Sequence, residues 1–146
     1  MPEPPDDSPG EDVRDDLGEA FWAVARQLRQ LHRAALAPWE ITPSQQRALG
    51  TLFRHGNIRL SGLAEHLRIA ARSATEVVDG LEERGFVERR PDPHDRRATL
   101  VALTGRGAEL ADTIRASRDA TSEGLFNRLS ADDRAALSRI LRVLRA

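Results

Sequence analysis

The sequence predicts a mainly α-helical fold that contains one small β-hairpin. Apolar residues recur at steps of three and four along most of the chain, which is the period of an amphipathic helix. Two short runs, residues 86–90 and 98–103, break this period and flank a loop rich in proline and charge, as the strands of a hairpin do. At 146 residues, the chain has the length of a single domain with a modest core.

Charge is unevenly distributed along the chain. Residues 1–19 hold eight acidic side chains and one arginine, a balance of −7, whereas the other 127 residues have a balance of +6. A basic body is compatible with a polyanionic partner. All 22 basic residues are arginines, which equally indicates the codon bias of a GC-rich genome, so composition alone leaves both interpretations open.

Several classes of protein are disfavoured by composition. Cysteine is absent, which excludes disulfides and thiolate metal sites and suits a reducing cytoplasm. No apolar stretch approaches the roughly 20 residues of a membrane span. The N-terminus is acidic and proline-rich, unlike a signal peptide. We therefore expect a soluble, cytoplasmic protein that contacts no membrane.

The N-terminal part divides into a tail and a helix. Residues 1–11 are acidic, rich in proline and nearly free of large apolar side chains, which predicts a disordered tail. Residues 12–41 predict a long helix and a loop: one apolar face recurs from Val13 to Ala35, and Ala37-Pro38 should end the helix. A small chain cannot easily cover such a face, and a partner subunit is one way to cover it.

Residues 42–103 begin with a clear helix start. Thr42 is suited to be the N-cap, with proline next and Gln45 placed to complete a capping box. Leu49, Leu52 and Phe53 predict the buried face of this helix, and the run His55-Gly56-Asn57 predicts its end.

A short strand, two helices and a hairpin are predicted next. Residues 58–60 form the strand candidate, and Ser61 is expected to cap a brief helix. A second helix should run from about Ala71 to Arg84, stopped by Gly85. Its predicted apolar stripe consists of Ala74, Val77, Val78 and Leu81.

Two more helices are predicted in residues 104–146, one capped by Thr104 and one beginning at Ser130. Two short helices followed by a two-stranded hairpin are in the order of a winged helix-turn-helix, in which the second helix lies in the DNA major groove. The hairpin loop, or wing, can then reach a flanking minor groove. We thus expect a winged helix-turn-helix lobe at 42–103 between terminal dimerisation helices.

The motifs that carry a family resemblance lie in this lobe. They are the run LSGLA at 60–64, LEERGFVER at 81–89, DPHDRR at 92–97, LVALT at 100–104, and Gly107. In this order and spacing the chain resembles the multiple-antibiotic-resistance regulators, the MarR family. The Asp-x-Arg of the loop, followed by a strand and Leu-Thr, is the most specific part of the resemblance.

The resemblance implies a homodimeric bacterial transcription regulator, often a repressor released by a small aromatic or anionic effector. Such a two-fold dimer should read a pseudo-palindromic operator in double-stranded DNA. The alternative is a winged-helix module that binds another protein and no specific DNA. We expect no enzyme activity, because the chain has no phosphate-binding loop and no nucleophile elbow. We expect no cofactor and no metal, because the four histidines show no ligand spacing.

Arginines of the hairpin and polar residues of the second helix are the predicted DNA contacts. Arg97 can enter a narrow minor groove, and Arg96 can contact DNA beside it. Asp95 should pair with Arg97 and support the loop. Of Arg89 and Arg90, we expect the first to support the wing and the second to bind DNA. Predicted contacts on the second helix are Arg72, Ser73 and Thr75.

Two features depart from the family's pattern at the second helix. It starts with Ala70-Ala71 where the family has a Ser or Thr cap, and alanine cannot accept the free N–H groups there. Glu76 and Gly80 stand where basic residues are common, and with Asp79 the carboxylate of Glu76 favours the protein-binding alternative.

A cleft beside the dimerisation helices is where the resemblance implies effector binding. Aromatic and basic residues of the first two predicted helices are candidates for it, although core packing or a solvated face accounts for each of them equally well. These candidates are Trp22, Arg29, His32, Trp39 and Phe53.

Overall fold

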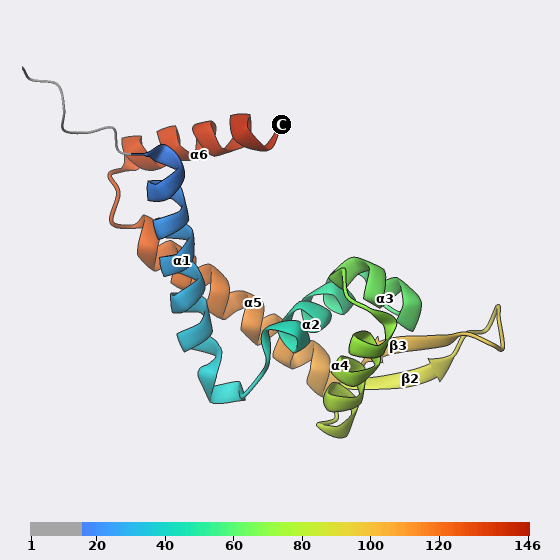
Figure 1. Cartoon of the computed structure of the whole chain (residues 1–146). Helices are drawn as coiled ribbons and strands as arrows, with labels where there is room; N and C mark the ends of the chain where they lie inside the picture. The colour runs from blue at the N-terminus through green and yellow to red at the C-terminus, as the bar shows by residue number, and fades with distance from the viewer. Residues whose placement is uncertain (1–15) are drawn as a thin grey trace, which may run out of the picture.

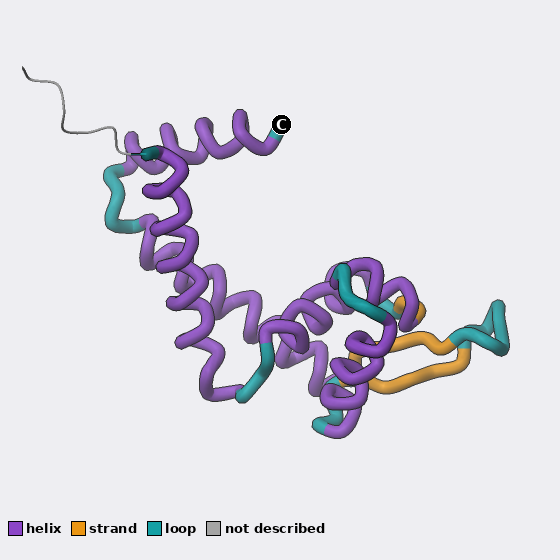
Figure 2. Tube along the Cα trace, in the orientation of Figure 1, coloured by secondary structure: helices purple, strands orange, loops and turns teal. Residues whose placement is uncertain are grey.

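The computed structural model describes residues 16–146, so the predicted tail and Val13 lie outside the described residues. Its helices form two groups (Figure 1). The helix α1 (Leu17–Leu36) packs along the longer α5 (Gly105–Phe126), and α6 (Ala131–Arg145) crosses their far end. The other group is a compact lobe at the opposite end of α5, and all the described strands lie in it (Figure 2).

The first helix ends where proline was predicted to stop it. The Asp16 carboxylate accepts the Gly18 N–H at 3.0 Å as the N-cap of α1, and a short 3₁₀ turn, η1 (Ala37–Trp39), follows the helix. Glu40 then adopts a left-handed conformation, φ 50°, which reverses the chain toward the lobe. The turn is held by Arg84, whose guanidinium donates to the carbonyls of Trp39 and Glu40 at 2.7 and 2.9 Å.

The helix α2 (Pro43–His55) has the predicted capping box. The Gln45 N–H donates to the Thr42 hydroxyl, and the Thr42 N–H donates to the Gln45 side chain, both at 3.1 Å. Gly56 ends the helix at φ 75°, a conformation that favours glycine.

The next helix starts two residues earlier than predicted. The strand β1 covers only Ile58–Arg59, and α3 (Leu60–Leu67) begins directly after it with Arg59 at the N-cap. Ser61 therefore does not cap the helix; it lies in the first turn. The reason is the pairing of Arg59 with Leu100 of the hairpin, which holds Arg59 in extended backbone up to the helix start.

The lobe is completed by the hairpin and by the second helix of the helix-turn-helix, its recognition helix. The helix α4 (Ala71–Glu83) is followed by Gly85 at φ 78°, and the hairpin strands are β2 (Val87–Pro91) and β3 (Thr99–Leu103). The sheet order is β1-β3-β2 with both pairs antiparallel, so the predicted hairpin is the larger part of a three-stranded sheet.

The core lies inside the lobe and extends to the start of α5. Its fully buried large side chains come from all three lobe helices and the hairpin: Leu49, Leu52, Leu63, Val78, Leu81, Val87 and Val101. The prediction that Phe53 is part of the buried face is wrong, because this side chain is 42% exposed. Its ring lies at the edge of the lobe, where the Arg115 guanidinium covers it at 5.8 Å from the ring centre.

A short junction fixes α5 to the lobe. The Thr104 hydroxyl donates to the Gly85 carbonyl at 2.6 Å and accepts the Gly107 N–H at 3.1 Å, which confirms the predicted cap. Gly107 lies so close to the hairpin that a Cβ atom there would be 1.8 Å from the Phe86 carbonyl oxygen. The position of the hairpin relative to α5 is therefore set by backbone contact.

The helix α6 adds nothing to the buried core. Its start is capped by Ser130, as predicted, and Arg134 clamps it to the end of α5 through both carboxylate oxygens of Glu123 at 2.6 and 2.7 Å. Apolar residues on α6 stay open: Val143 is 69% and Leu144 72% exposed. Among residues 16–146, no helix is long and apolar enough to span a membrane.

Candidate nucleic-acid interface

The recognition helix presents a polar outer face. Ala74, Val78 and Leu81 point into the core and thereby fix the rotation of α4. The Arg72 side chain is 93% exposed, and Ser73 is exposed beside it. Thr75 lies at the side of the helix, and its hydroxyl donates to the Ala71 carbonyl at 3.1 Å. Arg72 and Ser73 are thus available to a partner, whereas the Thr75 hydroxyl can only accept from one.

The helix start is open, as the alanines predicted. Ala70 is the N-cap in extended backbone and supplies no side-chain hydrogen bond. The first N–H groups of α4 consequently have no side-chain acceptor from the cap. Backbone N–H groups at a helix N-terminus bind anions such as phosphate.

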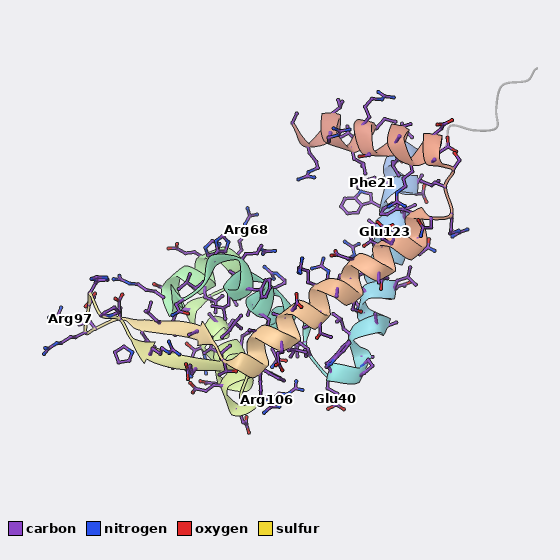
Figure 3. The ribbon with its side chains drawn as sticks, turned by 180° about the vertical axis from the view of Figure 1, so that it is seen from behind. Phe21, Glu40, Arg68, Arg97, Arg106 and Glu123 are labelled. Carbon is purple, nitrogen blue, oxygen red and sulfur yellow. The ribbon has the colours of Figure 1, made fainter. Side chains whose placement is uncertain are left out.

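The wing ends in two exposed arginines. Arg96 and Arg97 are both exposed at the tip of the hairpin, and the Arg97 side chain projects away from the rest of the molecule (Figure 3). In the part of the chain that the structure describes, neither guanidinium forms an ion pair. Asp95 does not pair with the Arg97 guanidinium as predicted: its carboxylate accepts the Arg97 backbone N–H at 3.0 Å. Asp95 therefore shapes the turn and leaves the arginine charge free.

A second aspartate, which the sequence reasoning missed, anchors the wing. The Asp92 side chain is only 6% exposed; it accepts Arg59 Nε at 2.8 Å and the His94 backbone N–H at 2.9 Å. The His94 hydrogen bond, followed by the hydrogen bond and charge of Arg59, holds the pKa of Asp92 below its usual range. The sequence does contain one signal for Asp92: it lies between Pro91 and Pro93. These two prolines make the loop stiff on both sides of it.

Arg89 and Arg90 have different partners. Arg89 reaches from β2 to α4, where it binds Asp79 at 2.6 Å and Glu82 at 2.9 Å. It therefore ties the wing to the recognition helix and neutralises two carboxylates. Arg90 points to the other side and pairs with Glu88 on its own strand.

A small cavity lies between α1, α2 and α5, with a volume of about 210 Å³. Its apolar wall comes from α2 and α5 and includes Leu49 and Ile114. Its polar lining includes three arginines and one carboxylate, namely Arg54, Arg115, Arg118 and Asp119. The lining thus places more positive than negative charge beside an apolar wall.

The predicted cleft residues are only partly gathered at this cavity. His32 and Phe53 line it, whereas Trp22, Arg29 and Trp39 do not. Trp22 is exposed on α1 and Trp39 packs against the lobe core. The helical period could not separate them, because it places residues on a face of a helix and not on a particular neighbour.

His32 is the polar contact between the two long helices at the cavity. Its Nε2 lies 3.1 Å from the Ser122 hydroxyl oxygen of α5. Burial and the charge of Arg118 lower the pKa of His32, so the ring is mainly neutral at neutral pH.

The fold is that of a winged helix-turn-helix protein, and its exposed arginines suit a nucleic-acid partner. Residues 41–99 match the model of the MarR family. The chain is 31% identical over 128 residues to the multiple antibiotic resistance protein MarR of Salmonella typhimurium, covering 86% of this chain and 88% of that protein. It is 40% identical over 114 residues to an uncharacterized HTH-type transcriptional regulator of Mycobacterium leprae, covering 78% and 75%.

Solved structures agree with these sequence matches. A mutant of MarR from E. coli has a TM-score of 0.79 at 28% identity and covers 93% of this chain and 99% of that one. A Mycobacterium tuberculosis protein has a TM-score of 0.82 at 27% identity, with coverage of 94% and 96%. The chain belongs to the MarR family of helix-turn-helix transcriptional regulators. Its relatives are regulators and not enzymes.

Proposed function

We propose that the protein is a homodimeric repressor that binds a pseudo-palindromic operator and is released from it by a small-molecule effector. The observation that carries the DNA-binding part is the free pair of wing arginines beside an exposed recognition helix. Arg97 would enter the minor groove, Arg96 would contact the backbone beside it, and Arg72 and Ser73 would contact the major groove. Asp79 is one of the carboxylates that favoured a protein partner. Because Arg89 pairs with it, this carboxylate is not free to bind such a partner.

The proposed dimer follows from the open apolar faces of the terminal helices. Phe21 and Trp22 of α1 are 54% and 55% exposed, and their rings meet edge to face at 6.2 Å. Figure 3 shows Phe21 on the side of α1 near α6. A soluble chain rarely leaves aromatic and aliphatic side chains open over two helices, and a second copy offers the same surfaces for a two-fold contact.

The proposed effector site is the cavity at His32. Repression would be relieved if a ligand there changed the position of α1 against α5, because α5 is fixed to the hairpin through Thr104 and Gly107. A volume of about 210 Å³ limits the ligand to a small molecule, and the arginines favour a carboxylate or phenolate.

A salt titration tests the proposal. The full chain is titrated onto the DNA upstream of its own gene and onto a scrambled duplex of equal length. We expect tight binding to the first and a steep loss of affinity with rising salt, because arginine–phosphate contacts release counterions. Equal affinity for both duplexes, or no binding at low salt, contradicts the proposal.

A thermal-shift series with small aromatic carboxylates then tests the cavity, with Arg118→Ala as the variant that should lose the shift.

A further inference from the structure

The outer face of α4 carries more negative than positive charge. Opposite its core-facing residues, at about 3.6 residues per turn, the face holds one arginine and three carboxylates: Arg72, Glu76, Asp79 and Glu83. A helix that approaches phosphates is expected to have the opposite balance. The carboxylates therefore need an explanation in terms of what each one contacts.

Only one of these carboxylates stands free where a recognition helix meets base edges. Asp79 is bound by Arg89 at 2.6 Å. Glu83 is the last residue of α4, whereas bases are contacted by the N-terminal part of such a helix. Glu76 lies in that part, its side chain is 73% exposed, and its nearest cation is Arg72 Nε at 4.0 Å. An exposed pair at this distance contributes little to stability, so both groups can take other partners.

A carboxylate in the major groove can only accept hydrogen bonds, so it needs a base that donates. Cytosine offers its N4 amino group and adenine its N6 amino group. Adenine also presents the N7 acceptor beside that donor, which repels a carboxylate, while cytosine has no such neighbour on its own edge. Cytosine is therefore the base that Glu76 fits.

We propose that Glu76 is a specificity-determining residue that selects cytosine through its N4 amino group. Arg72 then binds guanine O6 and N7 in the same or a neighbouring base pair. Four residues of helix rise about 6 Å, and base pairs are about 3.4 Å apart, so the two contacts fall within two base-pair steps. The inference rests on the proposed entry of α4 into the major groove.

Selection from random-sequence DNA tests this inference. The wild-type chain, Glu76→Gln and Glu76→Ala are each used to select binding sites, with Glu83→Gln as a control on the same face. We expect the wild type to require cytosine at one position of each half-site. Glu76→Gln should change that position to adenine, because glutamine bonds adenine N6 and N7 together. Glu76→Ala should accept any base there, and Glu83→Gln should select the wild-type site.

The decisive measure is the specificity ratio, which is the affinity for the selected site divided by the affinity for a site with another base at that position. Both Glu76 variants lose a negative charge and should bind all DNA somewhat more tightly. In the wild type, replacing the selected cytosine should weaken binding by about 5- to 150-fold, and in Glu76→Ala by far less. Identical selected sites for the wild type and both variants overturn the inference while leaving DNA binding intact. A wild type that selects no site at all overturns the inference and the proposed function together.

Discussion

At the scale of single residues, the exposed charge of Arg97 is the feature most directly linked to DNA binding. Its guanidinium is free at the wing tip, and its backbone N–H is fixed by Asp95. We predict that Arg97→Ala weakens operator binding about tenfold and lowers the slope of log affinity against log salt by about one. Fluorescence anisotropy at several salt concentrations measures both.

The matched control for Arg97 is Arg128→Ala. Arg128 is an exposed arginine in the turn between α5 and α6, at the opposite end of the molecule from the wing (Figure 1). The substitution Arg128→Ala removes the same charge without changing the lobe, so operator affinity should barely change. Equal losses in the two variants would mean that the wing acts only through net charge.

Gly107 is the residue with the least freedom to change. Because a Cβ atom at this position would be 1.8 Å from a backbone oxygen, no side-chain movement can relieve the clash. We predict that Gly107→Ala lowers the free energy of unfolding by about 3 kcal/mol or more, as measured by urea denaturation. The control Gly124→Ala lies on α5 with open space around it, and there alanine should stabilise the helix by about 0.5–1 kcal/mol.

Functional residues were predictable from the sequence where their role depends only on their neighbours along the chain. The Asp-x-Arg motif located the wing, and a single exposed loop contains Arg96 and Arg97. The partner of Asp95 was not predictable, because a carboxylate can reach either the backbone or the side chain two residues on. The Arg59–Asp92 contact joins residues 33 positions apart, and no local pattern marks such a pair.

At the scale of elements, two arginines hold the wing through ion pairs, one on each side. Arg59 of β1 binds Asp92 at the base of the loop, and Arg89 of β2 binds α4. The orientation of the wing relative to the recognition helix thus depends on charged groups. A dimer that must place two wings and two helices on one duplex benefits from such fixed angles.

The Asp92 contact gives a pH dependence with a definite sign. Because the folded pKa of Asp92 is depressed, its stabilising effect is complete above the unfolded pKa of about 3.9 and is lost as pH falls through the folded value. We predict that Asp92→Asn is less stable than the wild type from neutral pH to about pH 5, and that the difference shrinks below about pH 4. Urea unfolding at a series of pH values measures this. A difference that stays constant with pH would show that the ionised carboxylate is not what holds the loop.

Element boundaries were predictable at most positions where the sequence contains a helix cap or a stop signal. Thr42, Thr104 and Ser130 cap their helices as predicted, and Gly85 ends α4 as predicted. The exception was Ser61, where strand pairing with the distant hairpin decided the start of α3. Tertiary contacts of this kind override a local capping preference.

At the scale of the whole molecule, the single chain leaves its terminal helices incompletely covered. The lobe has a closed core, whereas α6 contributes no buried residue and is held to α5 mainly through Arg134. The apolar period of the terminal helices was predictable, but the period does not say what covers the face. The proposed second copy supplies that cover and sets the spacing of the two recognition helices.

The dimer proposal predicts a strong effect of a charge on α6. Leu144 is 72% exposed in the single chain, and Leu144→Glu would place a carboxylate in the apolar contact once from each copy. Losing about 1.5–3 kcal/mol of leucine burial on each side should weaken dimerisation by at least about 100-fold. Sedimentation equilibrium should show monomers, and operator affinity should fall with the loss of the second half-site. The control Ser138→Glu puts the same charge on an exposed polar position of α6 and should remain dimeric. A Leu144→Glu protein that stays dimeric would place the subunit contact elsewhere on the chain.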